Sequence, residues 1–141
     1  MINEYQFNSI VKNKLIKKIK YNYLNYSYLK NYINKIYNNF DLPRESFIIA
    51  LYYLKKCTQC TKCNVKLYLL SSIIIANKQL LDDRLNLVKI YTFLNVNIKD
   101  EQNKEIEFLK LLNWNTYYNT EEYDQFKKYL VHHTDLLHIL N

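Results

Sequence analysis

Apolar residues recur along this chain at steps of three and four positions, the spacing that places side chains on one face of an α-helix. The first clear stretch is marked by Leu29, Ile33, Ile36 and Phe40. The second is marked by Phe47, Leu51 and Leu54. Pro43 fits the first turn of this second helix, where a missing N–H needs no partner. We therefore predict one helix that ends near Phe40 and another that ends near Cys57.

The centre of the chain has a different pattern, because the segment 64–81 is apolar on nearly every face. In a globular protein such a helix is surrounded by other helices, so we expect it to be the hub of the fold. Two further helices are marked by Leu87, Tyr91 and Leu94 and by Ile106, Leu109 and Leu112. Asp100 is the expected N-cap of the latter. A last long helix, capped at Asn119, is marked by the inward residues Tyr123, Phe126 and Leu130.

The first 22 residues are polar and rich in lysine, and their apolar positions are Ile10, Val11, Leu15, Ile16 and Ile19. We interpret this segment as an amphipathic helix with a solvated lysine face. A basic arm for nucleic acid or for localisation is the alternative. The chain then divides into an N-terminal basic helix at 1–23, five helices at 24–118 and a C-terminal helix at 119–141. A length of 141 residues fits one all-α domain.

Composition removes several classes of function. Glycine is absent and Pro43 is the only proline. The glycine-rich loops that let a backbone approach a phosphate closely are therefore excluded. Acidic residues are scattered, and no histidine lies near a serine or cysteine at a spacing typical of a nucleophile. We predict a protein that is not an enzyme and that uses no cofactor.

The formal net charge of +7 would ordinarily favour an acidic partner such as nucleic acid. The excess is nearly all lysine, in a chain that is also rich in Asn, Ile and Tyr. An AT-rich genome produces the same bias through its codons. We therefore interpret the lysines as solvated helix faces and disfavour nucleic acid as the partner.

Three cysteines, Cys57, Cys60 and Cys63, form a C-x-x-C-x-x-C run. Thiolates at this spacing can hold zinc or an iron–sulfur cluster, but four ligands are usual and no fourth lies nearby in the sequence. We interpret them as reduced loop thiols and predict no metal site, while a ligand from a distant segment stays open. His132, His133 and His138 are interpreted in the same way, as part of a solvated or partner-facing tail.

The sequence also bears on where in the cell the protein is expected. Lysines interrupt the apolar run that a signal peptide needs, and three cysteines fit a reducing compartment. The most apolar stretch, Leu67 to Ala76, falls well short of the roughly 20 residues of a membrane-spanning helix. We expect a protein of the nucleus and cytoplasm with no membrane partner.

Three segments, in this order, carry a resemblance to a known family: FIIALYYLKK at 47–56, LYLLSSIIIANKQLLD at 67–82 and EIEFLKLLNW at 105–114. They resemble the cyclin box over roughly residues 24–130. The chain is most similar to the fungal phosphate-pathway cyclins, in which the elements AL-x-YL and LLNW are typical. The resemblance implies a single five-helix cyclin box at 24–118 with additional N-terminal and C-terminal helices. It implies a regulatory subunit that binds and activates a cyclin-dependent protein kinase.

The resemblance also implies which residues bind the kinase. In the family a lysine and a glutamate, here Lys78 and Glu105, bind backbone groups of the helix that the kinase must move to become active. The apolar residues that match the centre of that interface are Ile75, Leu80 and Leu109. Packing in the core is the alternative role for these three.

Two departures limit the resemblance. Gln79 stands where many cyclins have an aromatic residue, and the segment 28–37 lacks the arginine-leucine and tryptophan pattern of a substrate-docking patch. We therefore do not expect substrates to be recruited through that patch. The alternative function is a cyclin-fold nucleic-acid-binding or transcription factor of the TFIIB type, since those proteins use the same helical box. They usually carry two boxes and a zinc ribbon, whereas this chain has one box and a short cysteine run.

Overall fold

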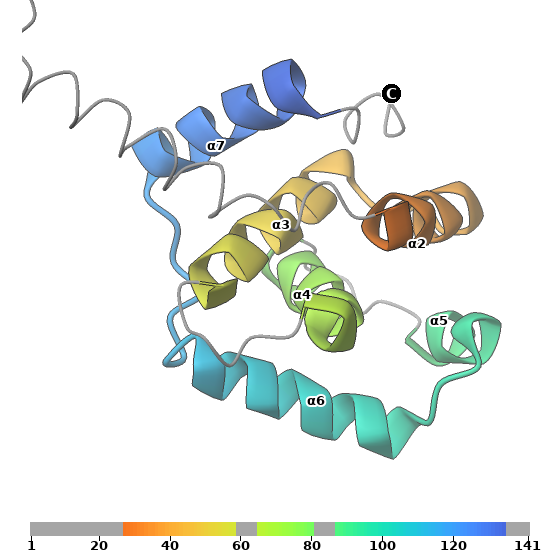
Figure 1. Ribbon diagram of the computed structural model, residues 1–141. Helices are drawn as coiled ribbons and strands as arrows, with labels where there is room; N and C mark the ends of the chain where they lie inside the picture. The colour runs from red at the N-terminus through yellow and green to blue at the C-terminus, as the bar shows by residue number, and fades with distance from the viewer. Residues whose placement is uncertain (1–26, 59–64, 81–86, 135–141) are drawn as a thin grey trace, which may run out of the picture.

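The computed structural model describes residues 27–58, 65–80 and 87–134, and within these ranges the chain is helical without any strand (Figure 1). The helices are α2 (Ser27–Asn39), α3 (Arg44–Thr58), α4 (Val65–Leu80), α5 (Leu87–Leu94), α6 (Ile98–Leu111) and α7 (Thr120–His133). The all-α prediction is confirmed. The helix predicted at 1–23 lies outside the described residues. None of the described helices is both long enough and apolar enough to cross a membrane.

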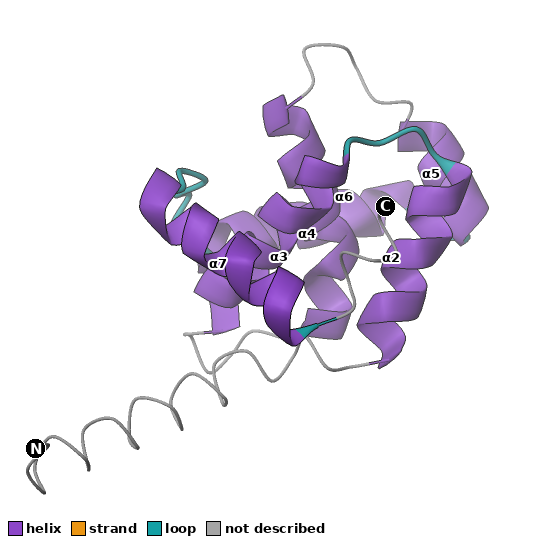
Figure 2. Ribbon diagram, turned by 90° about the horizontal axis from the view of Figure 1, so that it is seen from above, coloured by secondary structure: helices purple, strands orange, loops and turns teal. Residues whose placement is uncertain are grey.

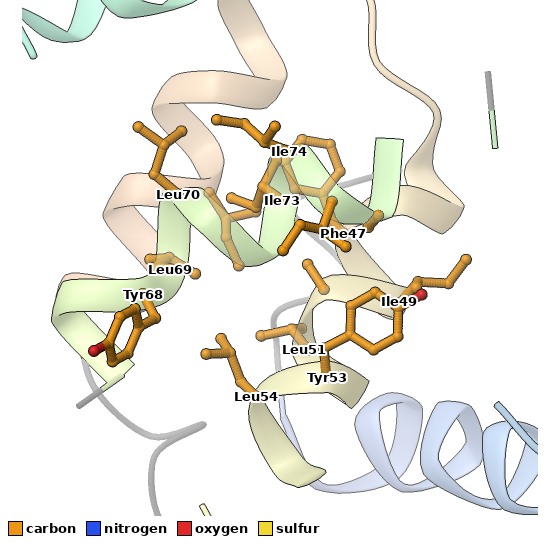
Figure 3. Close-up of a cluster of buried hydrophobic side chains, with 14 of the residues drawn as sticks. Phe47, Ile49, Leu51, Tyr53, Leu54, Tyr68, Leu69, Leu70, Ile73 and Ile74 are labelled. Carbon is orange, nitrogen blue, oxygen red and sulfur yellow. The ribbon is translucent and has the colours of Figure 1, made fainter. Parts of the chain in front are cut away.

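Helix α4 is the hub of the fold, as its apolar sequence predicts. Every residue from Tyr68 to Asn77 is buried. The helix packs against α2, α3 and α6, which surround it in Figure 1. Figure 3 shows its side chains Leu69 and Ile73 on the side of α3, and Leu70 on the side of α2. Each fully buried leucine or isoleucine stabilises the fold by about 1.5–3 kcal/mol, so the burial of these side chains contributes strongly to stability.

Helix α3 is buried on more faces than its predicted stripe. The stripe itself is confirmed, with all three of its members fully buried: Phe47, Leu51 and Leu54. The residues between them are buried too: Ile48, Ile49, Tyr52 and Tyr53. Because α3 packs against α4 and also against α7, little of its surface meets water. Pro43 lies one residue before the helix rather than in its first turn, and its carbonyl oxygen accepts the N–H of Ser46 at 3.0 Å.

Helix α6 differs from its prediction at its start and on its inward face. The N-cap is Asn97, whose side-chain oxygen accepts the N–H of Asp100 at 3.0 Å. Asp100 is therefore a first-turn acid near the positive end of the helix dipole and not the cap. Ile106 is 46% exposed rather than inward. The buried positions are Glu101, Glu105, Phe108 and, just after the helix, Leu112. Two glutamates take inward places, which a search for apolar residues alone does not find.

Helix α7 confirms its predicted cap and inward stripe. The Asn119 side-chain oxygen accepts the N–H groups of Glu121 and Glu122 at 2.8 and 3.3 Å. Phe126 and Leu130 are buried, and Tyr123 is partly buried against the core. Figures 1 and 2 show α7 lying over α3, the helix that it contacts. The C-terminal helix thus completes the cover of α3.

Polar contacts add to the packing between α3 and α7. The Tyr52 hydroxyl donates to Glu122 at 2.7 Å. Tyr123 donates to Glu45, and the Lys127 ammonium lies 3.0 Å from the same carboxylate. Desolvation tends to raise the pKa of Glu45, but the hydrogen bonds from Tyr123 and Lys127 and the Lys127 charge outweigh it and lower that pKa. The ionised form of Glu45 is therefore the one that holds α7 against α3.

Candidate functional site

The two charged residues predicted to bind a partner lie together on one surface. Lys78 is in the last turn of α4, Glu105 is in α6, and Lys78 Nζ lies 2.5 Å from Glu105 Oε1. They are 27 residues apart in the chain and meet because α4 packs against α6. The Lys78 side chain is 51% exposed, whereas that of Glu105 is 11% exposed. The ammonium is thus open to a partner, and the carboxylate lies at the edge of the core.

A second glutamate lies one helical turn before Glu105 and is more deeply buried. Glu101 is 3% exposed and accepts a hydrogen bond from the Ser71 hydroxyl of α4 at 2.9 Å. Desolvation raises the pKa of Glu101, and the nearby charge of Glu105 acts in the same direction. The Ser71 hydrogen bond and the Lys104 charge oppose this shift without cancelling it. The interior side of α6 therefore carries a carboxyl group that resists ionisation.

Tyr91 of α5 lies close to the same two carboxylates. Its side chain is 2% exposed, and its hydroxyl has no hydrogen-bond partner among the described residues. Burial raises the pKa of Tyr91 to about 12, with the charges of Glu105 and Glu101 adding to the effect. The Glu105 carboxylate that pairs with Lys78 therefore lies near a second acidic group, Glu101, and near the neutral phenol of Tyr91. This arrangement keeps the Lys78 cation next to negative charge that water cannot fully screen.

The three apolar residues predicted for the interface occupy different environments. Ile75 is 4% exposed and belongs to the core, which is the alternative role left open by the sequence. Leu80, the last residue of α4, is 37% exposed. Leu109 is partly buried and packs against the core. Only Leu80 therefore offers a large apolar surface to a partner, and a role of all three in kinase binding stays a prediction.

Two exposed aromatic residues near this surface were not predicted as site residues. Trp114 is 61% exposed and Tyr117 is 72% exposed, both in the segment that joins α6 to α7. Their residue type is visible in the sequence, but an aromatic residue more often fills a core than remains in water. The pattern that could have indicated their exposure is their position after the last inward residue of α6, Leu112.

The segment that carries these aromatic residues is fixed by the ends of α3 and α4. Lys56 Nζ lies 2.7 Å from the carbonyl oxygen of Tyr117, and the Tyr53 hydroxyl donates to the carbonyl oxygen of Thr116 at 2.9 Å. The side chain of Gln79, next to Lys78, lies 3.5 Å from the Thr116 hydroxyl. The segment thus lies beside the Lys78 end of α4, with Trp114 held at its start.

The backbone of this segment is strained where it leaves α6. Asn113 and Trp114 have φ angles of 54° and 60°, in the left-handed region. A bulky residue in this region costs about 1–3 kcal/mol and persists only where surrounding contacts enforce it. Here the Trp114 N–H donates to the carbonyl oxygen of Leu109 at 2.8 Å, which closes the end of the helix. The turn directs Trp114 away from the core.

The cysteine and histidine positions do not form a metal site in the part of the chain that the structure describes. No cluster of His, Cys, Asp or Glu side chains there could hold a metal ion. Cys57 is in the last turn of α3, fully buried and disulfide-bonded. The interpretation of three reduced loop thiols is therefore wrong for Cys57, because its sulfur is in a disulfide and the residue lies inside a packed helix. His132 is exposed on α7, while Cys60, Cys63 and His138 lie outside the described residues.

Comparison of the chain with protein-family models, with curated proteins and with solved structures finds no match.

Proposed function

We propose that this protein is a cyclin, a regulatory subunit that binds and activates a cyclin-dependent protein kinase and performs no chemistry of its own. The observation that carries the proposal is the ion pair between Lys78 and Glu105. The resemblance to the cyclin box names these two residues as partners in one interface. The packing of α4 against α6 brings them within 2.5 Å of each other at the surface.

The chemistry of the pair suits recognition of a polypeptide backbone. An ammonium group has three N–H donors, and Glu105 occupies one of those of Lys78, so donors remain for carbonyl oxygens of a partner. The carboxylate of Glu105 has further lone pairs for backbone N–H groups. Hydrogen bonds of charged groups are about twice as strong as neutral ones. The pair would therefore bind the end of a kinase helix in one orientation.

Apolar surface next to the pair supplies the rest of the proposed interface. Leu80 and the aromatic side chains of Trp114 and Tyr117 are exposed on segments that lie together at this end of α4. Interface centres are enriched in such aromatic residues. Leu109 is partly buried beside Glu105, and Ile75 lies beneath in the core. We assign Ile75 to the support of this surface and the other residues to direct contact.

Activation then follows from a difference in affinity. A cyclin that binds the active arrangement of its kinase more tightly than the inactive one shifts the population toward the active arrangement. No catalytic group of the cyclin is needed for this effect. The residues in contact must only fit one position of the kinase helix better than the other.

The proposal is tested by purifying the tagged chain from its own cells under mild conditions and identifying what accompanies it. A cyclin-dependent kinase should be recovered, and the recovered complex should phosphorylate a protein substrate. The double variant Lys78→Ala/Glu105→Ala should recover less kinase than the unmodified chain. Its matched control is Lys99→Ala/Glu121→Ala, which removes one exposed positive and one exposed negative charge elsewhere. It should recover the kinase as the unmodified chain does. Recovery of no kinase by either the unmodified chain or the control would refute the proposed function.

A further inference from the structure

A second charged surface lies on α2 and extends to its neighbours. Helices α2 and α5 contain lysines but no aspartate or glutamate. Lys35 of α2 lies over the ring of Phe93 of α5, with its Nζ 5.4 Å from the ring centroid. Lys66, in the first turn of α4, lies over Tyr28 of α2 at the same distance. Helices α4 and α5 thus each contact α2 through a lysine that lies over an aromatic ring.

The rings that hold these lysines are themselves packed. Tyr28 stacks on Tyr32 with centroids 5.7 Å apart, and Phe93 meets Phe40 edge-on at 5.3 Å. In the described part of the chain, neither Lys35 nor Lys66 forms an ion pair with an acidic residue. An aromatic ring attracts a lysine ammonium through its π electrons, whereas a hydrogen-bond acceptor would occupy one of the ammonium N–H donors. Both ammonium groups are therefore positioned and keep their donors for a ligand.

This surface is separate from the proposed kinase site. Lys66 and Lys78 lie in the first and last turns of α4. Twelve residues of helix at about 1.5 Å each place their backbones roughly 18 Å apart. A ligand on α2 and a partner at Lys78 could therefore bind at the same time.

We propose that the α2 surface, defined by Tyr28, Lys35, Lys66 and Phe93, docks an extended acidic peptide segment that also carries aliphatic side chains. Charge complementarity gives the acidic character, because the surface presents two placed cations and no carboxylate from α2 or α5. Tyr28 and Phe93 are 42% and 41% exposed, and Val88 of α5 is 61% exposed, so the ligand also meets apolar surface. The ligand is not one recruited through the arginine-leucine and tryptophan pattern, which the segment 28–37 lacks, and the proposal does not depend on the identity of the partner at Lys78.

A peptide fits this surface better than a single-stranded nucleic acid. Nucleic-acid binding to aromatic residues relies on ring faces on which bases can stack. Here Tyr32 and Lys66 already lie against Tyr28, and Lys35 lies over Phe93. Exposed ring edges and ammonium donors remain, which suit aliphatic side chains and carboxylates.

The test measures fluorescence anisotropy of a fluorescein-labelled decapeptide of Glu and Leu at low salt. The second probe is the same peptide with every Glu replaced by Gln, and the third is a labelled ten-nucleotide oligothymidine. The test variant is Lys35→Gln/Lys66→Gln. The matched control is Lys99→Gln/Lys128→Gln, which removes the same charge from exposed positions of α6 and α7. All four substitutions are at lysines on helix surfaces, and circular dichroism checks that each variant is folded.

The acidic peptide should bind the unmodified chain, and the test variant should weaken binding by about tenfold or more. The control variant should bind within about twofold of the unmodified chain, and so should Lys78→Ala, which separates this proposal from the kinase site. Equal binding of the Gln peptide, equal loss in the control variant, or no binding of the acidic peptide would overturn the proposal. Tighter binding of the oligothymidine that is lost in the test variant would assign the surface to nucleic acid instead.

Discussion

The hub helix α4 contains two regions that differ sharply in what surrounds them. From Tyr68 to Asn77 every residue is buried, and α2, α3 and α6 pack around the helix. Its last three residues, Lys78, Gln79 and Leu80, are exposed. The boundary falls between Asn77, which is 1% exposed, and its neighbour Lys78. One helix thus supplies both the core and the proposed contact with a partner, and substitutions in the two regions should have separate effects.

Polar groups behave differently in the two regions as well. Inside the helix, the Ser72 hydroxyl donates to the carbonyl oxygen of Leu69 and the Asn77 amide donates to that of Ile73, whereas the Ser71 hydroxyl donates to Glu101 of α6. At the end of the helix, Lys78 also reaches across to Glu105 on α6. The bonds of Ser72 and Asn77 involve no other helix. The bond of Lys78 to Glu105 leaves donors at the surface.

The largest expected effect is that of Ile74→Asp, in the buried region. Ile74 is 1% exposed, so the substitution places an unpaired carboxylate in the core. The cost is several kcal/mol, comparable to the whole stability of about 5–15 kcal/mol of a typical domain. We expect loss of the folded state by circular dichroism. The comparison is Leu80→Asp at the exposed end of α4, which should remain folded with a loss of about 1 kcal/mol. A folded Ile74→Asp variant would contradict the packing described for α4.

The next largest effect tests whether α7 is part of the packed core. Phe126 is 1% exposed where α7 covers α3. Phe126→Ala should lower the free energy of unfolding by about 3–5 kcal/mol in urea titrations. Val131 lies on the same helix but is 47% exposed, and Val131→Ala should change that free energy by about 0.5 kcal/mol or less. Similar losses for the two variants would show that α7 does not pack as described.

A smaller effect, of opposite sign, is expected at Glu101. Its pKa in the folded protein is raised above the ordinary 4.5, so ionisation of this buried group opposes folding at neutral pH. That cost is present above the folded pKa and disappears as the pH falls through it. Glu101→Gln keeps an oxygen for the Ser71 hydroxyl without the charge. It should stabilise the protein by about 1 kcal/mol at pH 7. The gain should shrink toward pH 5 in parallel urea titrations; a gain that grows on acidification would contradict the shift.

The sequence predicts the helices of this fold well, because their apolar residues repeat at the helical period. It predicts α4 as the hub for the same reason, and Asn119 as the cap of α7. On α6 it is right about Leu112, which is buried, and wrong about Ile106, which is exposed. It also misses Glu101 and Glu105, which hold inward positions that an apolar pattern assigns to water. Buried acids depend on partners from another helix, here Ser71 and Lys78, and such pairs are not visible along one helix.

The candidate site could be predicted only in part. The resemblance implies that Lys78 and Glu105 both bind the kinase, which stays a prediction, and the structure adds that the two side chains form an ion pair with each other. The different burial of Ile75 and Leu80 could not be read from the sequence, because both lie on a helix that is apolar all round. The exposure of Trp114 depends on a backbone turn with positive φ. Glycine is the usual sequence signal for such a turn, and none is present here.

The proposed kinase contact separates from the fold most clearly in one double variant, Lys78→Ala/Glu105→Ala. Removing Lys78 alone would leave the nearly buried carboxylate of Glu105 without its cation, at a cost of about 1–3 kcal/mol in stability. Removing both charges avoids that cost, so stability should change by only about 1 kcal/mol.

The decisive measurement is the affinity of this variant for the purified kinase by calorimetry, with thermal unfolding in parallel. Kinase binding should weaken by 2 kcal/mol or more, roughly thirtyfold, because the charged groups that bind the kinase backbone are gone. The Lys99→Ala/Glu121→Ala control should keep the original affinity. An unchanged affinity in the double variant would contradict the proposed site, and unfolding of that variant would show that the pair serves the fold instead.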